Sequence, residues 1–202
     1  TLDRLVRWLP DGPLPKTAVE ATESLRTAAT DRRRAWTLAV RQDADSSPSD
    51  IRRTGIIAAA LQLHFARLAA SLDPESLTHV ADAACPVCGS APMTSAVVGW
   101  PNAFNTRYCA CSLCGTLWIV VRVKCLYCGA TDGITYRMIE EQPETIKAES
   151  CNSCQSYIKV LYQTADPELD PFADDVASLS LDILMRQNNW RRRGQNVFLA
   201  GY

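Results

Sequence analysis

The chain has no excess of charge of either sign. Its 202 residues include 21 Lys and Arg against 22 Asp and Glu, which gives a formal net charge of −1. A balanced chain has no general electrostatic attraction to nucleic acid or to anionic lipid. Long apolar runs are also missing, since no stretch of the sequence approaches the roughly 20 residues that a membrane-spanning helix needs. We therefore expect neither a nucleic-acid partner nor membrane insertion.

Histidine is scarce, and this limits the catalytic chemistry that the chain can support. The two histidines are His64, in an apolar helical stretch, and His79, which precedes the first cysteine pair. The sequence has neither the Ser-His-Asp order of a hydrolase triad nor a Cys-His dyad. We interpret His64 as a packed or rim residue; for His79, an approach to a cysteine sulfur is the less favoured alternative. We predict no catalytic residue and expect that the protein is not an enzyme.

Cysteine, in contrast, is abundant and regularly spaced. Eight of the nine cysteines form four Cys-x-x-Cys pairs, and the first two pairs recur 40 residues later as the third and fourth. A thiolate pair three positions apart can bind one metal ion from a single tight turn, and two such pairs complete a tetrahedral site. The spacing therefore predicts two similar metal-binding ribbons in tandem. The predicted ligands are Cys85, Cys88, Cys111 and Cys114 in the first ribbon, and Cys125, Cys128, Cys151 and Cys154 in the second.

A secreted disulfide scaffold or a set of redox pairs is the alternative interpretation of these cysteines. The odd count, and the glycine that follows three of the four pairs, oppose a disulfide scaffold. A thioredoxin-type pair would need a helix that begins at the Cys-x-x-Cys turn, whereas strand-like sequence flanks these pairs. We therefore favour metal binding and a cytoplasmic location, where thiols stay reduced.

Spacing alone does not settle which pairs share a metal. Consecutive pairs could bind one ion each, a cross-brace would join the first pair to the third and the second to the fourth, and a nested arrangement would join the inner two pairs. The repeat favours consecutive pairing, because each unit then closes its own site. Tetrahedral thiolate sites accept Zn²⁺ or Fe. Because protein fills all four positions, we expect a structural metal, with rubredoxin-like electron transfer as the less favoured alternative.

The residues around the pairs give further expectations. Gly89, Gly115 and Gly129 follow three of the pairs, and glycine adopts positive φ without a Cβ clash, which lets the chain curl around a metal. Gln155 takes the fourth position, so we expect a less strained or differently shaped turn there. The ninth cysteine, Cys109, is interpreted as a buried or half-buried small residue rather than a ligand or nucleophile.

The order of patterns along the chain predicts an α+β protein. Residues 1–82 read as helical, with starts at a capping box of Thr17 and Glu20, at Thr30, and at Pro48 as a first helical residue. From Cys85 to Tyr162 short β-rich runs alternate with turns. The predicted fold is a helical N-terminal region, two tandem rubredoxin-like (zinc-ribbon) β modules, and a C-terminal helix.

The β-rich part divides at the repeat. We predict a first ribbon over residues 83–123 and a second over 124–164, each with a cysteine turn, a hairpin, a second cysteine turn and a strand. The expected hairpin connections are residues 99–102 and 140–144. Because no linker separates the ribbons, they should pack as one body.

Residues 165–202 should form a C-terminal helix and tail. The helix is expected from Phe172 to about Asn188. Asp174 and Asp175 are interpreted as carboxylates that stabilise its first turn. The predicted buried face consists of Val176, Leu179, Ile183 and Leu184.

Several segments together resemble one protein family. They are Cys85-Pro86-Val87-Cys88-Gly89-Ser90, Arg107-Tyr108, Cys111-Ser112-Leu113-Cys114, Val121-Arg122-Val123-Lys124-Cys125, Ile146-Lys147-Ala148-Glu149-Ser150-Cys151 and Ala173-Asp174-Asp175-Val176-Ala177-Ser178-Leu179. In this order they resemble the formate dehydrogenase accessory protein family, FdhE. The resemblance is strong over residues 85–202 and looser over the first 82.

This resemblance implies a function. Such a protein would be a cytoplasmic maturation factor or chaperone that formate dehydrogenase needs for activity, and it would bind the molybdenum-containing catalytic subunit. The resemblance also implies two rubredoxin-like sites, each holding one Fe ion on four of the eight paired cysteines, with Zn as the alternative metal. Candidate anchors for the partner are Trp100 and the Arg191–Arg193 cluster, which is otherwise expected to be a solvated face. Alternative functions are an electron carrier serving formate dehydrogenase and a zinc-ribbon nucleic-acid binder.

Overall fold

The computed structural model describes residues 1–9, 14–42, 48–194 and 196–199. These described residues form two compact units: those up to Ser71 form a helical unit together with Val197–Leu199, and those between Leu72 and Asn196 form a unit that contains both cysteine-rich modules. The α+β class is confirmed. The finer boundaries at residues 83, 124 and 165 stay predictions. None of the described helices is long and apolar enough to cross a membrane.

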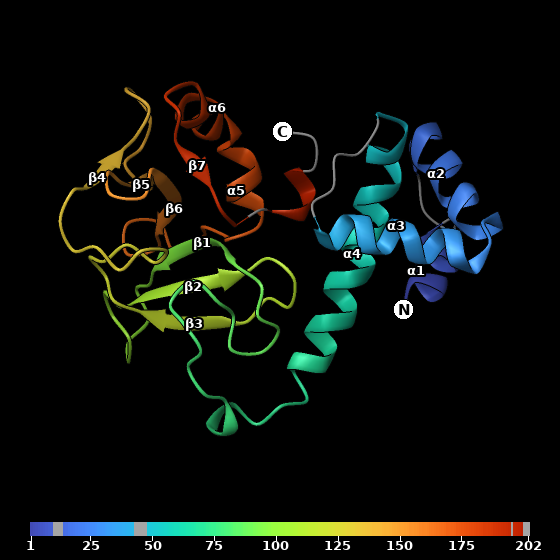
Figure 1. Ribbon diagram of the computed structural model, residues 1–202, viewed down its shortest axis with the longest axis horizontal. Coiled ribbons are helices and arrows are strands. Elements are labelled where there is room, and N and C mark those ends of the chain that lie inside the picture. Colours follow the sequence, from blue (N-terminus) through green and yellow to red (C-terminus); the bar gives the residue numbers. More distant parts are fainter. Residues whose placement is uncertain (10–13, 43–47, 195, 200–202) are drawn as a thin grey trace. The chain divides into compact units, whose positions relative to one another are not determined.

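Four α-helices make up most of the described part of the helical unit (Figure 1). They are α1 (Leu2–Trp8), α2 (Lys16–Thr27), α3 (Thr30–Gln42) and α4 (Pro48–Ala69), and the short 3-10 helix η3 (Val197–Leu199) also belongs to this unit. Val6, Leu25 and Ile57 form the buried core between α1, α2 and α4. The unit therefore has an apolar core of its own that contains no cysteine.

The helix starts expected from the sequence are partly confirmed. α3 begins at Thr30 and α4 at Pro48, as predicted. The capping box at Thr17 is wrong, because α2 begins at Lys16 with Pro15 at its N-cap and without a side-chain cap hydrogen bond. The ring of Pro15 already holds φ at −57°, so the helix starts ahead of the threonine.

One sheet of seven strands organises the second unit, which also contains the 3-10 helix η2 (Pro74–Ser76). The strands are β1 (Pro92–Val97), β2 (Arg107–Cys111), β3 (Leu117–Val120), β4 (Ile134–Arg137), β5 (Ile146–Cys151), β6 (Ser156–Tyr162) and β7 (Arg191–Arg192). Their order is β3-β2-β1-β6-β5-β4, and β7 pairs with β6. Each module is an antiparallel three-stranded ribbon, and the parallel pair β1·β6 joins the two. The expectation that the ribbons pack as one body is confirmed.

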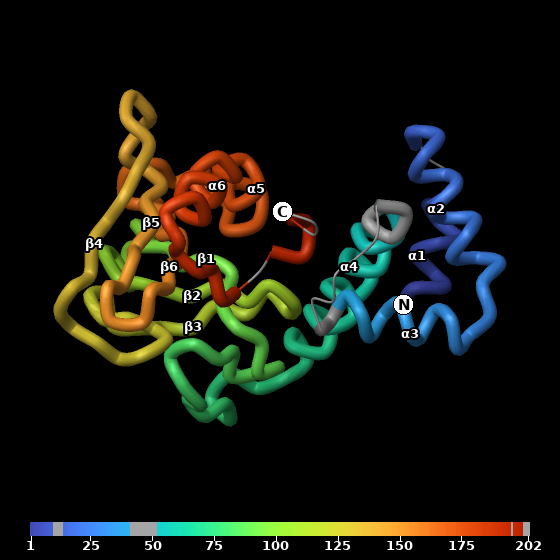
Figure 2. The backbone as a smooth tube through the Cα atoms, turned by 45° about the horizontal axis from the view of Figure 1, so that its top comes forward, coloured from blue at the N-terminus to red at the C-terminus, as the bar shows by residue number. Residues whose placement is uncertain are grey.

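The two ribbons are similar but not identical. The expected connections at residues 99–102 and 140–144 do lie within antiparallel hairpins, β1–β2 and β4–β5, and the second connection projects beyond the sheet beside α6 (Figure 2). The β1–β2 register shifts between Pro92 and Thr94, whereas β4–β5 runs without a shift from Ile134 to Arg137. The duplication therefore set the plan of both ribbons, and local irregularities distinguish the copies.

The C-terminal helix differs from the expectation. It is divided at Ser178 into α5 (Ala173–Ala177) and α6 (Leu179–Gln187). The predicted buried face is wrong, since Val176, Ile183 and Leu184 are between 38% and 46% exposed. Leu181 and Met185 are buried instead, in a cluster with Ala148, Tyr157 and Trp190. α5 and α6 are rotated about their axes relative to the expectation, because carboxylates as well as apolar side chains face the sheet.

A buried ionic cluster binds α5, α6 and β7 to β6. Lys159 of β6 is fully buried, and its Nζ lies 2.8 Å from Asp175 Oδ1 and 2.6 Å from Asp182 Oδ2. Arg192 of β7 donates to both Asp175 carboxylate oxygens and to Asp182 Oδ1. Tyr157 donates to Asp182 from the same strand as Lys159. The two cations balance the two carboxylates, which is the condition for burying charge without a large net penalty.

This cluster corrects two expectations. Asp175 does lie in the first turn of α5, as expected, but it is buried against Lys159 and does not cap the helix. The first backbone N–H groups are capped by Asp170, whose Oδ1 accepts from Phe172 and Ala173. Arg192 is not part of a solvated face, because its guanidinium is committed to Asp175 and Asp182. Local sequence could not reveal either contact, since the partners lie on separate elements.

A second buried ion pair links the two ribbons. Arg107 of β2 and Glu149 of β5 form two hydrogen bonds of 2.9 and 3.0 Å, with side-chain exposures of 0% and 3%. Arg107 also donates to Ser95 Oγ, and Tyr136 donates to Glu149. Because Arg107 belongs to the first ribbon and Glu149 to the second, the pair fastens the modules to each other.

Candidate metal centres

Each ribbon brings four cysteine sulfurs to one point. In the first, Cys85 Sγ lies 3.5 Å from Cys114 Sγ, and Cys88 Sγ lies 3.4 Å from Cys111 Sγ. Within each quartet all four sulfurs lie within 4.8 Å of one another. In the second ribbon the corresponding distances, Cys125–Cys154 and Cys128–Cys151, are both 3.6 Å. The sulfurs are grouped as in the consecutive scheme, not as in the cross-brace or the nested arrangement.

These distances fit a tetrahedral metal site. Sulfurs bound at about 2.3 Å from one ion stand about 3.8 Å apart in an ideal tetrahedron. All nine cysteines are free thiols, and a disulfide would bring two sulfurs to about 2.05 Å. Each quartet could therefore hold one metal ion. The role of the eight cysteines as ligands stays a prediction, and the donor set accepts both Fe and Zn.

Each cysteine turn closes in the same way. The residue after the second cysteine donates its N–H to the carbonyl oxygen of the first cysteine, with N···O distances between 2.9 and 3.3 Å in the four turns. Gly129, for example, has φ of 78°. The expectation of a differently shaped turn at Gln155 is wrong, because Gln155 adopts φ of 52° and donates to Cys151 O. Its side chain also donates to Asn152 O, which offsets part of the roughly 1–2 kcal/mol cost of a left-handed backbone.

Polar groups surround the sulfurs of the first quartet. The backbone N–H groups of Leu113 and Cys114 point at Cys111 Sγ, each at 3.4 Å. The hydroxyl oxygen of Thr116 lies 3.0 Å from Cys114 Sγ, and that of Ser90 lies 3.4 Å from Cys88 Sγ. In this structure the Cys88 thiol donates to the Ser90 oxygen. Four thiolates around a divalent ion would carry a net charge of −2, and the N–H and hydroxyl groups could then donate to the sulfurs and stabilise that charge.

The closeness of the sulfurs changes their acidity. A hydrogen bond from Cys111 lowers the pKa of Cys85 to about 6. The same neighbour lowers the pKa of Cys88. The pKa of Cys111 is raised, chiefly by its hydrogen bond with Cys114. Some thiols of the first quartet therefore lose their proton easily, and others keep it. A metal ion must displace the remaining protons when it binds.

The remaining candidate residues lie outside both quartets. Cys109 is fully buried, as expected, and burial raises the pKa of its thiol to about 12. The Nε2 of His79 lies 3.2 Å from Asp82 Oδ1, so its partner is a carboxylate rather than a sulfur. His64 is an exposed residue, with Nδ1 3.2 Å from Thr1 Oγ1. Neither histidine is a member of either cysteine group.

Sequence reasoning missed the buried charges of this unit. Lys159 stands between apolar residues of a strand, and Arg107 opens another strand beside the second cysteine turn. A charged residue at a strand position that should be buried is a signal for a buried ion pair, because an unpaired charge there would be too costly. The signal identifies the cation but not its partner.

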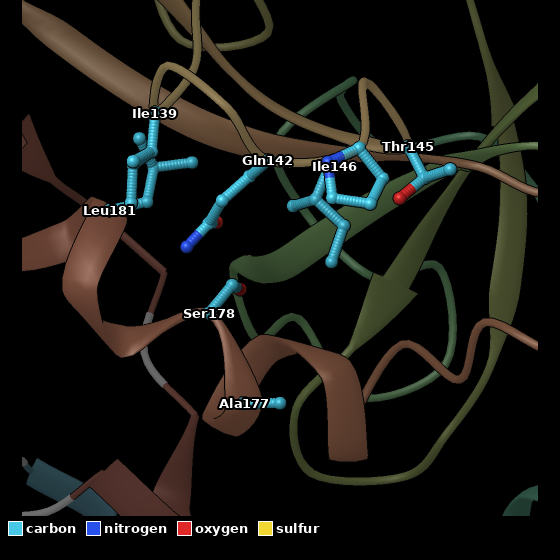
Figure 3. A pocket seen from close by; sticks show the side chains of 8 residues that line it. Ile139, Gln142, Thr145, Ile146, Ala177, Ser178 and Leu181 are labelled. Atoms are coloured by element: carbon cyan, nitrogen blue, oxygen red, sulfur yellow. The ribbon is translucent and has the colours of Figure 1, made fainter.

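A cavity of about 150 Å³ lies between the β4–β5 connection and helices α5 and α6 (Figure 3). Ile139 and Leu181 face each other across one side, and the Gln142 and Ser178 side chains point toward the interior. Ligand pockets are usually about 300–1,000 Å³. The Ser178 hydroxyl is already occupied, because it accepts from Lys159 Nζ and donates to Asp174 O. We interpret this space as a packing cavity rather than a ligand site.

Comparison with known proteins identifies the family. Three family models match consecutive parts of the chain: the N-terminal model of FdhE at residues 1–82, its central domain at 84–122 and its C-terminal domain at 123–199. The crystal structure of the FdhE protein from Pseudomonas aeruginosa matches with a TM-score of 0.88 and 32% identity, over 99% of this chain and 70% of that one. The chain belongs to the FdhE family.

Individual relatives support the same assignment. An FdhE homologue from Rhizobium meliloti is 43% identical over 190 residues, which cover 93% of this chain and 62% of the relative. The FdhE protein from Salmonella arizonae is 40% identical over 159 residues, which cover 78% of this chain and 51% of the relative. The chain thus spans about half to three-fifths of the length of these FdhE relatives.

Proposed function

We propose that this protein is an accessory factor for the maturation of formate dehydrogenase. It binds the catalytic subunit in the cytoplasm and does not itself oxidise formate. The observation that carries the proposal is the pair of cysteine quartets, each able to hold a metal ion, in a chain of the FdhE family. The buried Arg107–Glu149 pair and the shared sheet keep the two ribbons in fixed positions, which suits a docking scaffold.

The eight paired cysteines are proposed to hold two metal ions, one per quartet, with iron favoured over zinc on the family resemblance. A bound iron ion would supply a structural cross-link and a one-electron couple, and zinc only the cross-link. The protein's own groups supply the rest: positive-φ turns position the sulfurs, and N–H and hydroxyl groups near Cys111 and Cys114 offset their charge. Neither ion would have an open position for substrate, which fits an accessory role rather than catalysis.

Trp100 is the stronger of the two anchor candidates for the partner. Its side chain is 44% exposed, and its ring lies 5.2 Å from the ring of Tyr108, which limits its freedom before binding. Exposed, preordered aromatic residues often dominate the energy of an interface. The Arg191–Arg193 cluster is less suited, because Arg192 already pairs with Asp175 and Asp182.

Copurification with the formate dehydrogenase catalytic subunit tests the proposal. The tagged chain should retain the subunit, and Trp100→Ala should weaken retention by roughly tenfold or more, as expected for an aromatic anchor. Trp8→Ala is the matched control, since Trp8 is 70% exposed but lies in the helical unit. Absence of association under both anaerobic and aerobic conditions would remove this function.

An electron carrier for the same dehydrogenase is the second candidate. The exposed sulfur of Cys128 favours it, because electron exchange is fastest where a thiolate-bound iron lies close to the surface. A reversible one-electron couple in the iron-loaded chain would support this alternative. The nucleic-acid alternative is less favoured, since Arg192 of its basic cluster is used inside the fold.

A further inference from the structure

We propose that the two cysteine quartets are inequivalent: the second is the site at which metal is exchanged, and Arg193 is the residue that controls its opening. The inference rests on the proposed binding of metal by both quartets. It concerns how this chain holds and releases the ions, and three differences between the sites carry it.

The first difference is access to the sulfurs. Cys85, Cys111 and Cys114 of the first quartet are buried, and Cys88 is half-buried. In the second quartet Cys128, the counterpart of Cys88, is exposed. A competing donor can therefore reach the second ion from solvent. With an ion held there, such a donor would replace the Cys128 sulfur, and the released thiolate would take up a proton from water.

The second difference is the set of hydroxyl groups around the sulfurs. Ser90 and Thr116 stand beside Cys88 and Cys114 in the first site. Forty residues later their counterparts are Ala130, which has no hydroxyl, and Ser156. The Ser156 hydroxyl donates to the carbonyl oxygen of Cys154. The thiolates of the second site therefore lack this hydroxyl support.

The third difference is the C-terminal strand β7 together with Arg193, which directly follows it. Arg193 Nε donates to Ser156 Oγ at 2.7 Å, and the Arg193 guanidinium lies 5.6 Å from the centre of the Tyr127 ring. Tyr127 belongs to the Cys125–Cys128 turn, whereas Ser156 follows the Cys151–Cys154 turn. One side chain thus connects the two turns that must separate when the second metal leaves. β3, the counterpart of β6, is an edge strand in the described part of the sheet, without such an addition.

Arg193 is accordingly a positioning residue that acts on the ligands through Ser156 and Tyr127. Removing a group that holds a metal-binding residue in place typically lowers the metal affinity by about 10–100-fold. The structure provides a matched control in Arg191, whose side chain is exposed and whose contribution is a backbone hydrogen bond to Gln155 O. It also provides an internal reporter in Cys109, a fully buried thiol outside both quartets.

The test uses the full chain loaded with zinc. The chromogenic chelator 4-(2-pyridylazo)resorcinol removes the metal in the presence of iodoacetamide, and peptide mass spectrometry then identifies the cysteines that are alkylated over time. We expect zinc to be released in two kinetic phases whose rate constants differ by about tenfold or more, which is the range typical of groups that hold metal ligands in place. The fast phase should coincide with alkylation of Cys125, Cys128, Cys151 and Cys154. Arg193→Ala should accelerate the fast phase by about tenfold and leave the slow phase unchanged. Arg191→Ala should change neither.

The outcomes separate this inference from the function on which it rests. A chain that binds no zinc would refute metal binding by the quartets, and with it the inference. Two bound ions that leave at the same rate, or earlier loss from the first quartet, would overturn the inference alone. If Arg193→Ala also accelerates alkylation of Cys109, its effect is general unfolding and the positioning role is wrong. Thr116→Val provides a second check, since it should accelerate only the slow phase.

Discussion

Lys159 illustrates how a single residue holds the C-terminal helices in place. Its ammonium group is fully buried and contacts carboxylates from both α5 and α6. Arg192 supplies the second positive charge from β7. A buried ion pair is not in itself strongly stabilising, but removing one partner leaves an uncompensated charge in the interior.

Lys159→Met should therefore strongly destabilise the second unit. One cation would remain for Asp175 and Asp182, and we expect a loss of about 3–5 kcal/mol in the free energy of unfolding. Urea unfolding of the metal-loaded chain measures this loss. The matched control is Lys147→Met, which removes a pair with the exposed carboxylate of Glu144 and a contact with the Tyr162 ring, and should cost no more than about 1–2 kcal/mol. Equal effects of the two substitutions would contradict the role assigned to the cluster.

The buried thiol of Cys109 should make stability depend on alkaline pH. Burial raises the pKa of this thiol in the folded chain from 9.0 to about 12. The unfolded chain therefore loses the Cys109 proton first, and the folded state loses relative stability as the pH rises from 9.0 toward 12.

Cys109→Ala should remove this contribution. Between pH 9 and pH 11 the variant should lose stability less steeply than the parent, by up to about 1.4 kcal/mol per pH unit. Urea unfolding at a series of pH values under anaerobic conditions measures the two slopes. Parallel slopes would show that Cys109 does not titrate differently in the folded and unfolded chain.

At the scale of elements, each ribbon closes its own quartet while the sheet runs through both. The first quartet combines the turn before β1 with the turn between β2 and β3, and the second repeats this around β4, β5 and β6. β1·β6 pairing and the Arg107–Glu149 ion pair couple the ribbons without using any of the eight sulfurs. Binding of the two ions should thus be separable even though the ribbons share one sheet.

Cys125→Ser should leave one metal equivalent bound to the chain. The first quartet keeps its four sulfurs and its hydroxyl donors, so only the second ion is lost. Elemental analysis of the anaerobically purified full chain measures the stoichiometry, and its optical spectrum distinguishes iron thiolate from zinc. Cys85→Ser is the matched control and should also retain one equivalent, in the second quartet. Loss of both ions in either variant would show that the ribbons do not close independently.

At the scale of the whole molecule, the chain contains two units with separate sources of stability. The helical unit has an apolar core of Val6, Leu25 and Ile57. The second unit has two apolar clusters, around Leu161 and Leu181, supplemented by ion pairs and by the cysteine quartets. Metals that bind only the folded state contribute their binding energy directly to folding.

Metal removal should therefore affect the two units differently. After chelation, we expect the amides of β1 to β6 to exchange hydrogen faster, while those of α1 to α4 keep their protection. Hydrogen exchange followed by mass spectrometry measures both in one sample. Simultaneous loss of protection in the helices would mean that the units unfold together.

Much of the cysteine site and the fold plan could be predicted from local sequence. The four Cys-x-x-Cys pairs and their 40-residue repeat led to two ribbons, to the grouping of the sulfurs and to hairpins at the right places. The turn at Gln155 could not be predicted, because a hydrogen bond and the shape of the turn outweigh the preference of glutamine for negative φ. The buried pairing of Asp175 could not be predicted for a different reason, since its partners Lys159 and Arg192 lie on other elements.

The sequence by itself determined which residues can bind metal and how the ribbons repeat, because both depend on spacing along the chain. Only the tertiary structure decided that Lys159 and Arg192 are buried with Asp175 and Asp182, and that Arg193 bridges the turns of the second quartet. These contacts join residues of separate strands and helices. Their energy depends on distance and desolvation in the folded chain, and neither quantity is recorded in the local pattern.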